Sequence, residues 1–157
     1  MFRLERTDAK SIQFQDLVKA LDAGLAIVDG DDHEFYHQFN GIDNIQYVVL
    51  GYVDHQAVAC GAIKKFNAEY MEVKRMYVKP AYRGNAYALD LLKELEQWSR
   101  ALGYTHCILE TGRKQTAAIN LYEKADYEYI DNYGQYAGVK NSLCSVSYTH
   151  LTLPTKA

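Results

Sequence analysis

Cysteine is scarce in this chain of 157 residues, which holds three: Cys60, Cys107 and Cys144. They are odd in number and far apart in the sequence. A disulfide framework needs paired cysteines, and a cysteine metal site needs closely spaced ones. We therefore expect reduced thiols, no structural metal at these residues and a cytoplasmic location.

An excess of positive charge is also lacking. Seventeen Lys and Arg residues stand against twenty Asp and Glu, for a formal net charge of −3. A protein that binds nucleic acid needs a basic stripe or patch. The charge balance predicts no nucleic-acid partner and fits an enzyme that takes a cationic amine.

Long apolar runs are missing as well. No segment approaches the roughly 20 apolar residues of a membrane-spanning helix. The N-terminus carries Arg3, Glu5, Arg6 and Asp8 in place of the apolar run of a signal peptide. No association with a membrane is expected.

The chain contains enough apolar residues to form one hydrophobic core. Apolar residues make up 48% and charged residues 24%, and the length is close to that of one domain. We expect a single domain over residues 1–146. The Ser/Thr-rich segment 147–157 is expected to be a non-native or disordered tail, since it resembles translated adapter read-through; a natural terminal strand with a frayed end is the alternative.

Hydrophobic periodicity and turn residues predict alternating elements along this domain. Ser11 is a candidate helix cap, with Ile12, Leu17, Val18 and Leu21 on the buried face. Antiparallel strands followed by alternating helix and strand indicate an α/β (α+β) class with one mixed sheet. The expected strands cover residues 2–6, 47–53, 57–66, 71–78 and 106–110, the expected helices 12–22, 31–40, 84–102 and 115–124, and a hairpin 127–143.

Residues 72–88 join a strand to a helix through a turn of small residues. The free N–H groups and the dipole at a helix start favour an anion, and small residues let a diphosphate approach the backbone. The segment has neither the Gly-x-x-x-x-Gly-Lys-Ser/Thr pattern nor the Gly-x-Gly-x-x-Gly pattern of nucleotide sites. A plain strand–turn–helix connection is the alternative interpretation.

This segment resembles motif A of the GNAT superfamily of N-acetyltransferases. The family pattern is Arg/Gln-x-x-Gly-x-Gly/Ala after a strand that ends in Val-x-Pro. Here it corresponds to Val78-Lys79-Pro80 followed by Arg83-Gly84-Asn85-Ala86-Tyr87-Ala88. In the family this loop holds the pyrophosphate of acetyl-CoA. Ala86 stands where Gly is usual, and it is expected in the first helical turn, where Ala costs little.

Residues 115–127 resemble a second part of the family pattern, Asn-x-x-Ala-Ile-x-Leu-Tyr-x-x-x-Gly-Phe/Tyr. Ala118, Ile119, Leu121, Tyr122 and Tyr127 match it. Gln115 replaces Asn and keeps an amide that can bond the pantetheine arm. Asp126 replaces a Gly that normally has a left-handed conformation. The resemblance extends over roughly residues 45–144.

The resemblance implies the GNAT fold, a mixed and mostly antiparallel central sheet flanked by helices, whose strands part to admit pantetheine. It implies acetyl-CoA as cosubstrate, no metal, and direct attack by a primary amine with no acyl-enzyme. The residues that it assigns to acetyl-CoA are Met76, Tyr77, Val78, Arg83, Gly84, Asn85, Ala86, Tyr87, Ala88 and Gln115.

Three catalytic roles follow from the same resemblance. Glu72 is the candidate general base, because an alkylamine must lose a proton before it attacks. The backbone N–H of Met76 is the candidate oxyanion donor. Tyr122 is the candidate proton donor to the thiolate of CoA. The structural alternatives are an exposed strand glutamate for Glu72 and a core tyrosine for Tyr122.

The acceptor is left open: a small-molecule or peptide amine fits the acidic Asp29, Asp31, Asp32 and Glu34 and the aromatic Tyr129, Tyr133 and Tyr136. Fourteen tyrosines suit either core packing or the wall of a substrate cleft. A homodimer is also left open. The rival functions are a non-catalytic acyl-CoA-binding or regulatory domain and a tyrosine-rich protein-interaction module. His33 and His37, four apart, are interpreted as an exposed helix face and not as a metal site.

Overall fold

The structure is a computed structural model that describes residues 1–32 and 45–149. It is a mixed α/β fold with the strand order β1-β2-β3-β4-β5-β7-β6. Strand β2 pairs antiparallel with β1 and β3, and β7 pairs antiparallel with β5 and β6, whereas β4 and β5 pair in parallel. The predicted fold class, a mostly antiparallel mixed sheet with helices, is confirmed.

The chain divides into two compact units, and β3, β4 and α3 each contribute residues to both. The first unit contains residues 1–64 and 73–95, and the second contains 65–72 and 96–157. Each unit is described by itself. The first unit holds β1 (Phe2–Thr7), α1 (Ile12–Asp29), η1 (Gly30–Asp32), β2 (Tyr47–Val53), most of β3 (Gln56–Lys65), the end of β4 (Tyr70–Val78), η2 (Pro80–Tyr82) and most of α3 (Tyr87–Ala101).

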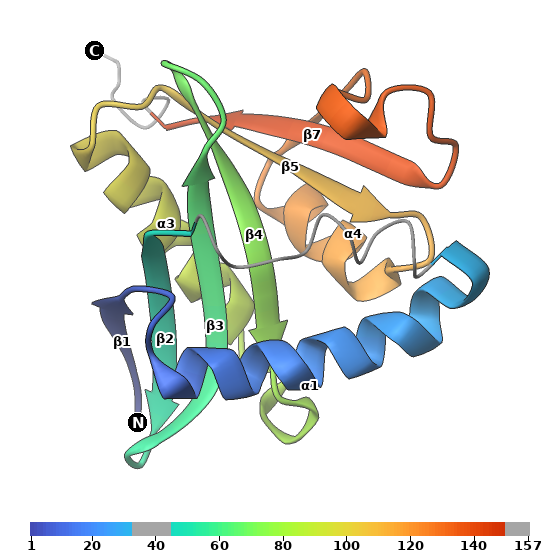
Figure 1. Cartoon of the computed structure of the whole chain (residues 1–157). Coiled ribbons are helices and arrows are strands. Elements are labelled where there is room, and N and C mark those ends of the chain that lie inside the picture. The colour runs from blue at the N-terminus through green and yellow to red at the C-terminus, as the bar shows by residue number, and fades with distance from the viewer. Residues whose placement is uncertain (33–44, 150–157) are drawn as a thin grey trace. The chain divides into compact units, whose positions relative to one another are not determined.

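Strand β2 forms the centre of the first unit because nearly its whole length is apolar. Val48, Val49 and Leu50 are fully or almost fully buried. The strand pairs antiparallel with β1 on one side and with β3 on the other. Helix α1 lies in front of these strands in Figure 1, and α3 lies behind them.

Helix α1 begins after Ser11, whose hydroxyl accepts a hydrogen bond from the N–H of Phe14 at 3.2 Å. Phe14, Leu17 and Val18 are buried in one cluster with side chains of β2 and β3. The placement of Ile12 on the buried face is wrong, since its side chain is 69% exposed.

The predicted end of this helix at residue 22 is also wrong, because it continues to Asp29. No residue before Gly30 forces a stop, and Gly30 takes a φ of 57°. The predicted helix 31–40 begins in a short 3-10 turn, Gly30–Asp32. Its remainder, with Glu34 and both histidines discussed above, lies outside the described residues.

The second unit is built on β5 (His106–Gly112) and β7 (Ser142–Tyr148), which pair antiparallel along their full length. Three residues of β4 join them, because Tyr70–Glu72 pair in parallel with His106–Ile108. Helix α4 and the end of α3 pack on one face, where the Ser99 hydroxyl lies 3.5 Å from the thiol of Cys107. The remaining elements are α4 (Thr116–Lys124), β6 (Glu128–Ile130) and η3 (Gly134–Tyr136).

The C-terminal strand is longer than predicted. The hairpin was expected over 127–143, but its second strand, β7, extends to Tyr148. Ser147 pairs with Cys107 and Tyr148 with His106, so these two residues belong to the sheet and not to the predicted tail. Residues 150–157 lie outside the described residues.

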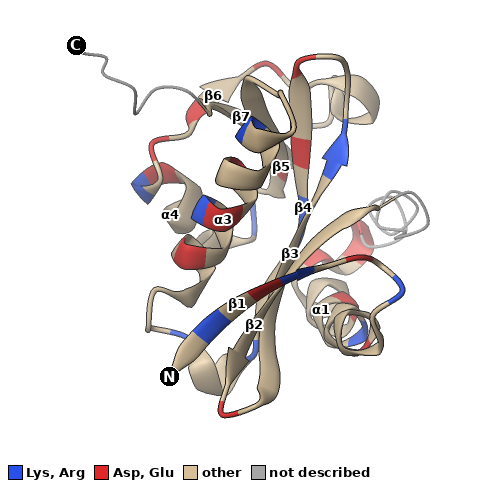
Figure 2. Cartoon of the chain, turned by 90° about the vertical axis from the view of Figure 1, so that its left-hand side faces the viewer, with Lys and Arg blue, Asp and Glu red and all other residues tan. Residues whose placement is uncertain are grey.

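Figure 2 shows acidic and basic segments interspersed along the elements in view. On β1, for example, Arg3 forms an ion pair with Glu5 at 3.1 Å. None of the helices in the described part of the chain is long and apolar enough to cross a membrane.

Candidate functional site

The last residues of β4 belong to the first unit and carry the predicted residues Met76, Tyr77 and Val78. A left-handed residue precedes them: Arg75 has a φ of 59° in the middle of a strand. Such a conformation is rare for a residue other than Gly, Asn or Asp and locally disrupts strand pairing, as in a β-bulge. The structure therefore redirects the chain immediately before Met76.

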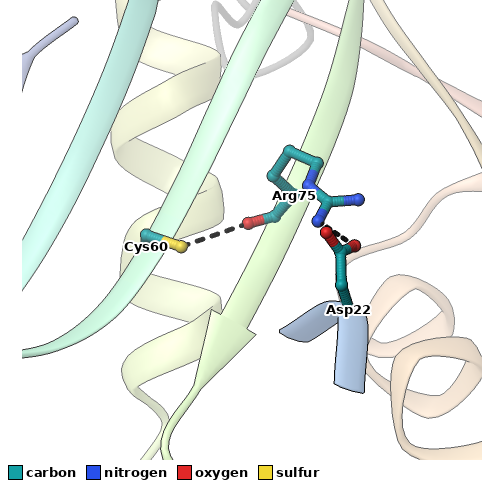
Figure 3. A network of polar contacts seen from close by, with 3 residues as sticks. All are labelled: Asp22, Cys60 and Arg75. Carbon is teal, nitrogen blue, oxygen red and sulfur yellow. Dashed lines mark hydrogen bonds and ion pairs between the residues drawn. The ribbon is translucent and has the colours of Figure 1, made fainter. Parts of the chain in front are cut away.

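The side chain of Arg75 is buried and forms an ion pair with Asp22 of α1 (Figure 3). Its side chain is 2% exposed, against 29% for that of Asp22. The carbonyl oxygen of Arg75 accepts a hydrogen bond from the thiol of Cys60 on β3 at 3.3 Å. Burial raises the pKa of the Cys60 thiol to about 12, so it remains a donor at neutral pH.

The side chain of Met76 lies over Gly61 of β3. A Cβ added at Gly61 would lie 2.5 Å from Met76 Sδ and 2.9 Å from Leu95 Cδ1. The absence of a side chain at Gly61 thus makes the room that Met76 occupies beside α3.

The loop after β4 is held by a backbone hydrogen bond to β3 and by the side chain of Arg83. The N–H of Lys79 donates to the carbonyl of Val58 on β3 at 2.8 Å, which fixes the strand end. The guanidinium Nε of Arg83 donates to the carbonyl of Val78 at 2.8 Å, and the group lies 5.6 Å from the ring centre of Tyr77. Arg83 is exposed, so this bond positions its charge at the loop surface.

Helix α3 begins at Tyr87 and not at residue 84 as predicted. Gly84 and Ala86 both have positive φ, of 86° and 64°, so neither belongs to a helical turn. The expectation that Ala86 lies in the first turn is wrong, and Ala there is strained. The N–H of Asp90 donates to the carbonyl of Ala86 at 3.1 Å, and the amides at the start of the helix have no earlier helical carbonyl to bond. This exposed start can accept an anion.

In the second unit, Glu72 of β4 is buried and accepts a hydrogen bond from the Tyr133 hydroxyl at 2.6 Å. Burial and the Glu72 carboxylate raise the pKa of Tyr133 far above its ordinary range, so it keeps its proton. Phe66 packs edge-on against the ring of Tyr133 at 5.1 Å between ring centres. The alternative of an exposed strand glutamate is therefore wrong for Glu72.

A second carboxylate lies on the same face of this sheet. Glu72 pairs with Ile108, and Glu110 follows two residues later, on the same face. Glu110 is directly opposite Cys144 of β7. Burial raises the pKa of Tyr136, and both carboxylates contribute to this rise. Carboxylates that lie near protonated phenols can bind a cationic ligand or accept a proton from that ligand.

Helix α4 carries the remaining predicted residues, Gln115 and Tyr122. Gln115 is the N-cap, but its side chain makes no capping hydrogen bond. Tyr122 is buried, and its ring meets Tyr127 edge-on at 5.6 Å between ring centres. Burial and Glu110 raise the pKa of Tyr122, so its phenol is protonated at neutral pH. Tyr122 also lines a small pocket together with Thr111, Ile119, Glu123, Tyr127, Tyr129, Leu143 and Ser145.

Asp126 follows this helix with a φ of 67°, the left-handed conformation predicted for its position. Tyr127, the last residue of the motif, is buried and donates its hydroxyl hydrogen to Glu96 at 2.7 Å. The motif residues at the end of α4 thus act in packing within the second unit.

The cysteines do not have the properties of nucleophiles. All three are free and buried, and burial raises the pKa to about 12 for Cys107 and to about 11 for Cys144. A nucleophilic thiol needs a lowered pKa. Among residues 1–32 and 45–149, no three His, Cys, Asp or Glu side chains lie close enough to hold a metal ion.

The predicted residues are thus divided between the units. Those from Met76 to Ala88 lie together in the first, and Glu72, Gln115 and Tyr122 lie in the second. The sequence analysis missed the Asp22–Arg75 pair and Glu110. Alternation along the strand 106–110 is a signal for Glu110, since it places this residue on the same face as Ile108. No local signal indicates that Arg75 pairs with a residue 53 positions away.

Comparisons with known proteins point to one family. The sequence profile of the Acetyltransferase (GNAT) family matches residues 14–127. A protein of Azospirillum brasilense named IAA acetyltransferase is 40% identical over 80 residues, which cover 50% of this chain and 52% of that protein. The chain thus spans about half the length of this relative.

Two solved structures are similar over nearly the whole chain. A candidate acyl-CoA N-acyltransferase of Klebsiella pneumoniae is 26% identical, with a TM-score of 0.80, and the match covers 95% of this chain and 98% of that one. The PaiA N-acetyltransferase of Thermoplasma acidophilum, solved with coenzyme A, is 15% identical, with a TM-score of 0.70, over 95% of this chain and 99% of that one. At that identity the second match shows the fold alone.

Proposed function

Because the chain belongs to the acetyltransferase (GNAT) family, we propose that it is an acetyl-CoA-dependent N-acetyltransferase that acts on a primary amine. The amine attacks the thioester directly, in a ternary complex with no acyl-enzyme. The family match extends over residues 14–127 and so includes both motifs and most of both units. The observation that carries the proposal is the loop at the start of α3, where the amides of an exposed helix start and the charge of Arg83 would favour an anion within the family motif.

The residues of this loop fit a diphosphate. Gly84 has no side chain, and a Cβ built there would meet nothing within 4 Å, so the backbone is open to a ligand. Arg83 supplies a positive charge already positioned by its bond to Val78. We assign the pyrophosphate of acetyl-CoA to residues 83–88, and the pantetheine arm to the backbone of Met76, Tyr77 and Val78 and to the amide of Gln115.

Three groups would carry the chemistry, and acetyl-CoA supplies the activated thioester. The buried carboxylate of Glu72 takes a proton from the ammonium form of the acceptor, because only a neutral amine can attack. The N–H of Met76 donates to the carbonyl oxygen of the acetyl group as negative charge develops there. As the C–S bond breaks, the phenol of Tyr122, which its raised pKa keeps protonated until then, would give its proton to the departing thiolate. The proton that the attacking nitrogen loses would restore the phenol, so the products are the amide and the free thiol of CoA.

The acceptor is proposed to be a small molecule that carries a cationic amine. The buried carboxylate of Glu72, the half-buried carboxylate of Glu110 and the phenols of Tyr133 and Tyr136 support this choice. The name of the Azospirillum relative, IAA acetyltransferase, supports a small-molecule acceptor in the family.

Thermal unfolding with and without acetyl-CoA tests the cofactor assignment. A ligand at about 100 times its Kd stabilises the native state by about 2.7 kcal/mol. We expect a clear rise in Tm for the wild type and for Arg100→Ala, a matched loss of one exposed positive charge at the other end of α3. The rise should shrink in Arg83→Ala. Equal rises in all three proteins would contradict the loop assignment.

A thiol-release assay tests the reaction. Benzylamine, spermidine and a lysine-containing peptide serve as acceptors, and free CoA is measured. Release that depends on the amine supports an N-acetyltransferase. A protein stabilised by acetyl-CoA that releases no thiol with any amine would be a non-catalytic binding domain. A protein that acetyl-CoA does not stabilise would favour an interaction module.

A further inference from the structure

The peptide group between Arg75 and Met76 is anchored more firmly than its place in a strand requires. Arg75 has a φ of 59°, a backbone conformation that L-amino acids rarely adopt. A conformation of this kind persists only where the surrounding structure holds it. Two separate contacts, one to the side chain and one to the backbone of Arg75, do so here.

The side-chain contact is the ion pair with Asp22, which ties β4 to α1 (Figure 3). The guanidinium is almost wholly buried, and its Nε has no hydrogen-bond partner. A buried charge held by one carboxylate is a costly arrangement that stability alone does not favour. The ion pair is therefore better explained by the backbone conformation that it holds.

The backbone contact is the hydrogen bond from the Cys60 thiol to the carbonyl oxygen of Arg75. A trans peptide group is planar, and its C=O and N–H point in opposite directions. The carbonyl of Arg75 and the N–H of Met76 belong to the same peptide group. Since the carbonyl points toward Cys60 on β3, the N–H of Met76 points away from β3.

We propose that Asp22, Arg75 and Cys60 are positioning residues that fix the Arg75–Met76 peptide group and so aim the Met76 N–H at the acetyl carbonyl. This inference rests on the proposed function, which makes that N–H the oxyanion donor. None of the three side chains touches the reacting atoms in this account. They act through the orientation of one peptide plane.

A selective NMR label tests the orientation directly. The chain has three methionines, so [15N]methionine gives few amide signals, and those of Met71 and Met76 can each be assigned by a single Met→Leu substitution. Acetyl-CoA and CoA differ by the acetyl group alone. In the wild type, the Met76 amide proton should move further downfield with acetyl-CoA than with CoA, while Met71 serves as the internal reference.

The variants separate positioning from packing. Cys60→Ala removes the donor, and Cys60→Ser keeps one. Cys107→Ala is the matched control, since Cys107 is also fully buried but its thiol bonds to Ser99 and not to the Arg75–Met76 peptide group. We expect the acetyl-dependent shift of Met76 to be lost in Cys60→Ala and in Asp22→Asn, and to be kept in Cys60→Ser and Cys107→Ala.

Kinetics with the best amine among benzylamine, spermidine and the lysine peptide gives a second readout. Removal of an oxyanion donor lowers kcat by about 100-fold or more, so a misdirected donor should lower it by about tenfold. Cys60→Ala should show this fall with an unchanged KM for acetyl-CoA, and Cys60→Ser should recover most of it. If Cys60 served only to fill the core, Cys60→Ala and Cys60→Ser would lower kcat to the same extent. The KM for acetyl-CoA would then change together with kcat.

The outcomes distinguish this inference from the proposed function. A wild-type Met76 shift that persists in Cys60→Ala and Asp22→Asn, with unchanged kcat, overturns the inference and leaves the proposed function standing. Binding of acetyl-CoA without any acetyl-dependent Met76 shift in the wild type overturns the role of Met76 and this inference with it. Absence of binding overturns both proposals.

Discussion

Gly61 lies beneath the side chain of Met76, so Gly61→Ala perturbs that residue without altering any polar group. The new Cβ would lie 2.5 Å from Met76 Sδ and 2.9 Å from Leu95 Cδ1, closer than real Cβ contacts. Leu95 is fully buried, and close packing in a protein core resists the displacement of such a side chain. Met76 must therefore change rotamer, or β3 and β4 must shift locally.

The magnitude follows from two opposing terms. Extra volume in a packed core costs about 1–3 kcal/mol. Ala is favoured over Gly in the interior of a strand by roughly 0.5–1 kcal/mol. The two ranges subtract to a net loss of unfolding free energy of about 0–2.5 kcal/mol. The centre of that range, ~1 kcal/mol, corresponds to about 2–4 °C in Tm for a chain of this size. The displaced Met76 should also lower kcat.

Urea denaturation of Gly61→Ala and of Gly24→Ala provides the assay and its control. Gly24 lies within α1, and a Cβ there would meet nothing within 4 Å. Gly24→Ala should thus raise the unfolding free energy by about 0.5–1 kcal/mol. Both variants should keep the wild-type m-value. A Gly61→Ala protein stabilised as much as Gly24→Ala would refute the close packing of Met76 against β3.

Four further substitutions test other parts of the structure. Ala86→Gly should raise the unfolding free energy by about 1 kcal/mol in thermal unfolding, because Ala86 has a φ of 64° that Gly adopts without strain. Burial raises the pKa of Cys60 from 9.0 to about 12, so the folded state keeps a proton that the unfolded state loses. The contribution of this thiol to the unfolding free energy is therefore complete below pH 9 and is lost as the pH rises toward 12. In urea titrations the unfolding free energy of the wild type should fall over this range by up to about 1.4 kcal/mol per pH unit, and Cys60→Ala should make that fall less steep. Tyr133→Phe removes the hydroxyl that donates to buried Glu72 and should cost about 1–3 kcal/mol in urea denaturation. Tyr129→Phe, at an exposed tyrosine, should change stability by less than about 0.5 kcal/mol.

Elements with a strong local pattern were predicted closely. The strand expected over 47–53 is found as Tyr47–Val53, since its apolar and β-branched residues favour a buried strand in any context. The helix expected over 115–124 is found as Thr116–Lys124. The family resemblance, which the profile match over residues 14–127 confirms, was read from two motifs that are each continuous in the sequence.

Boundaries were wrong where a local signal was ambiguous. Helix α1 passes the predicted end at residue 22 because its tertiary packing and helix-forming residues outweigh the presence of Gly24. Helix α3 starts late because Gly84 and Ala86 turn with positive φ. Single-sequence patterns do not reveal that an alanine takes such a conformation.

The sequence by itself determined the class of the fold, the family motifs and the candidate residues for acetyl-CoA. Only the tertiary structure decided that Arg75 is left-handed, that its charge is buried against Asp22 and that its carbonyl is bound by Cys60. The partners lie 53 and 15 residues from Arg75 in the sequence. Alternation along a strand predicts which face a side chain occupies, but the contacts that hold a strained peptide group come from elements that meet only when the chain has folded.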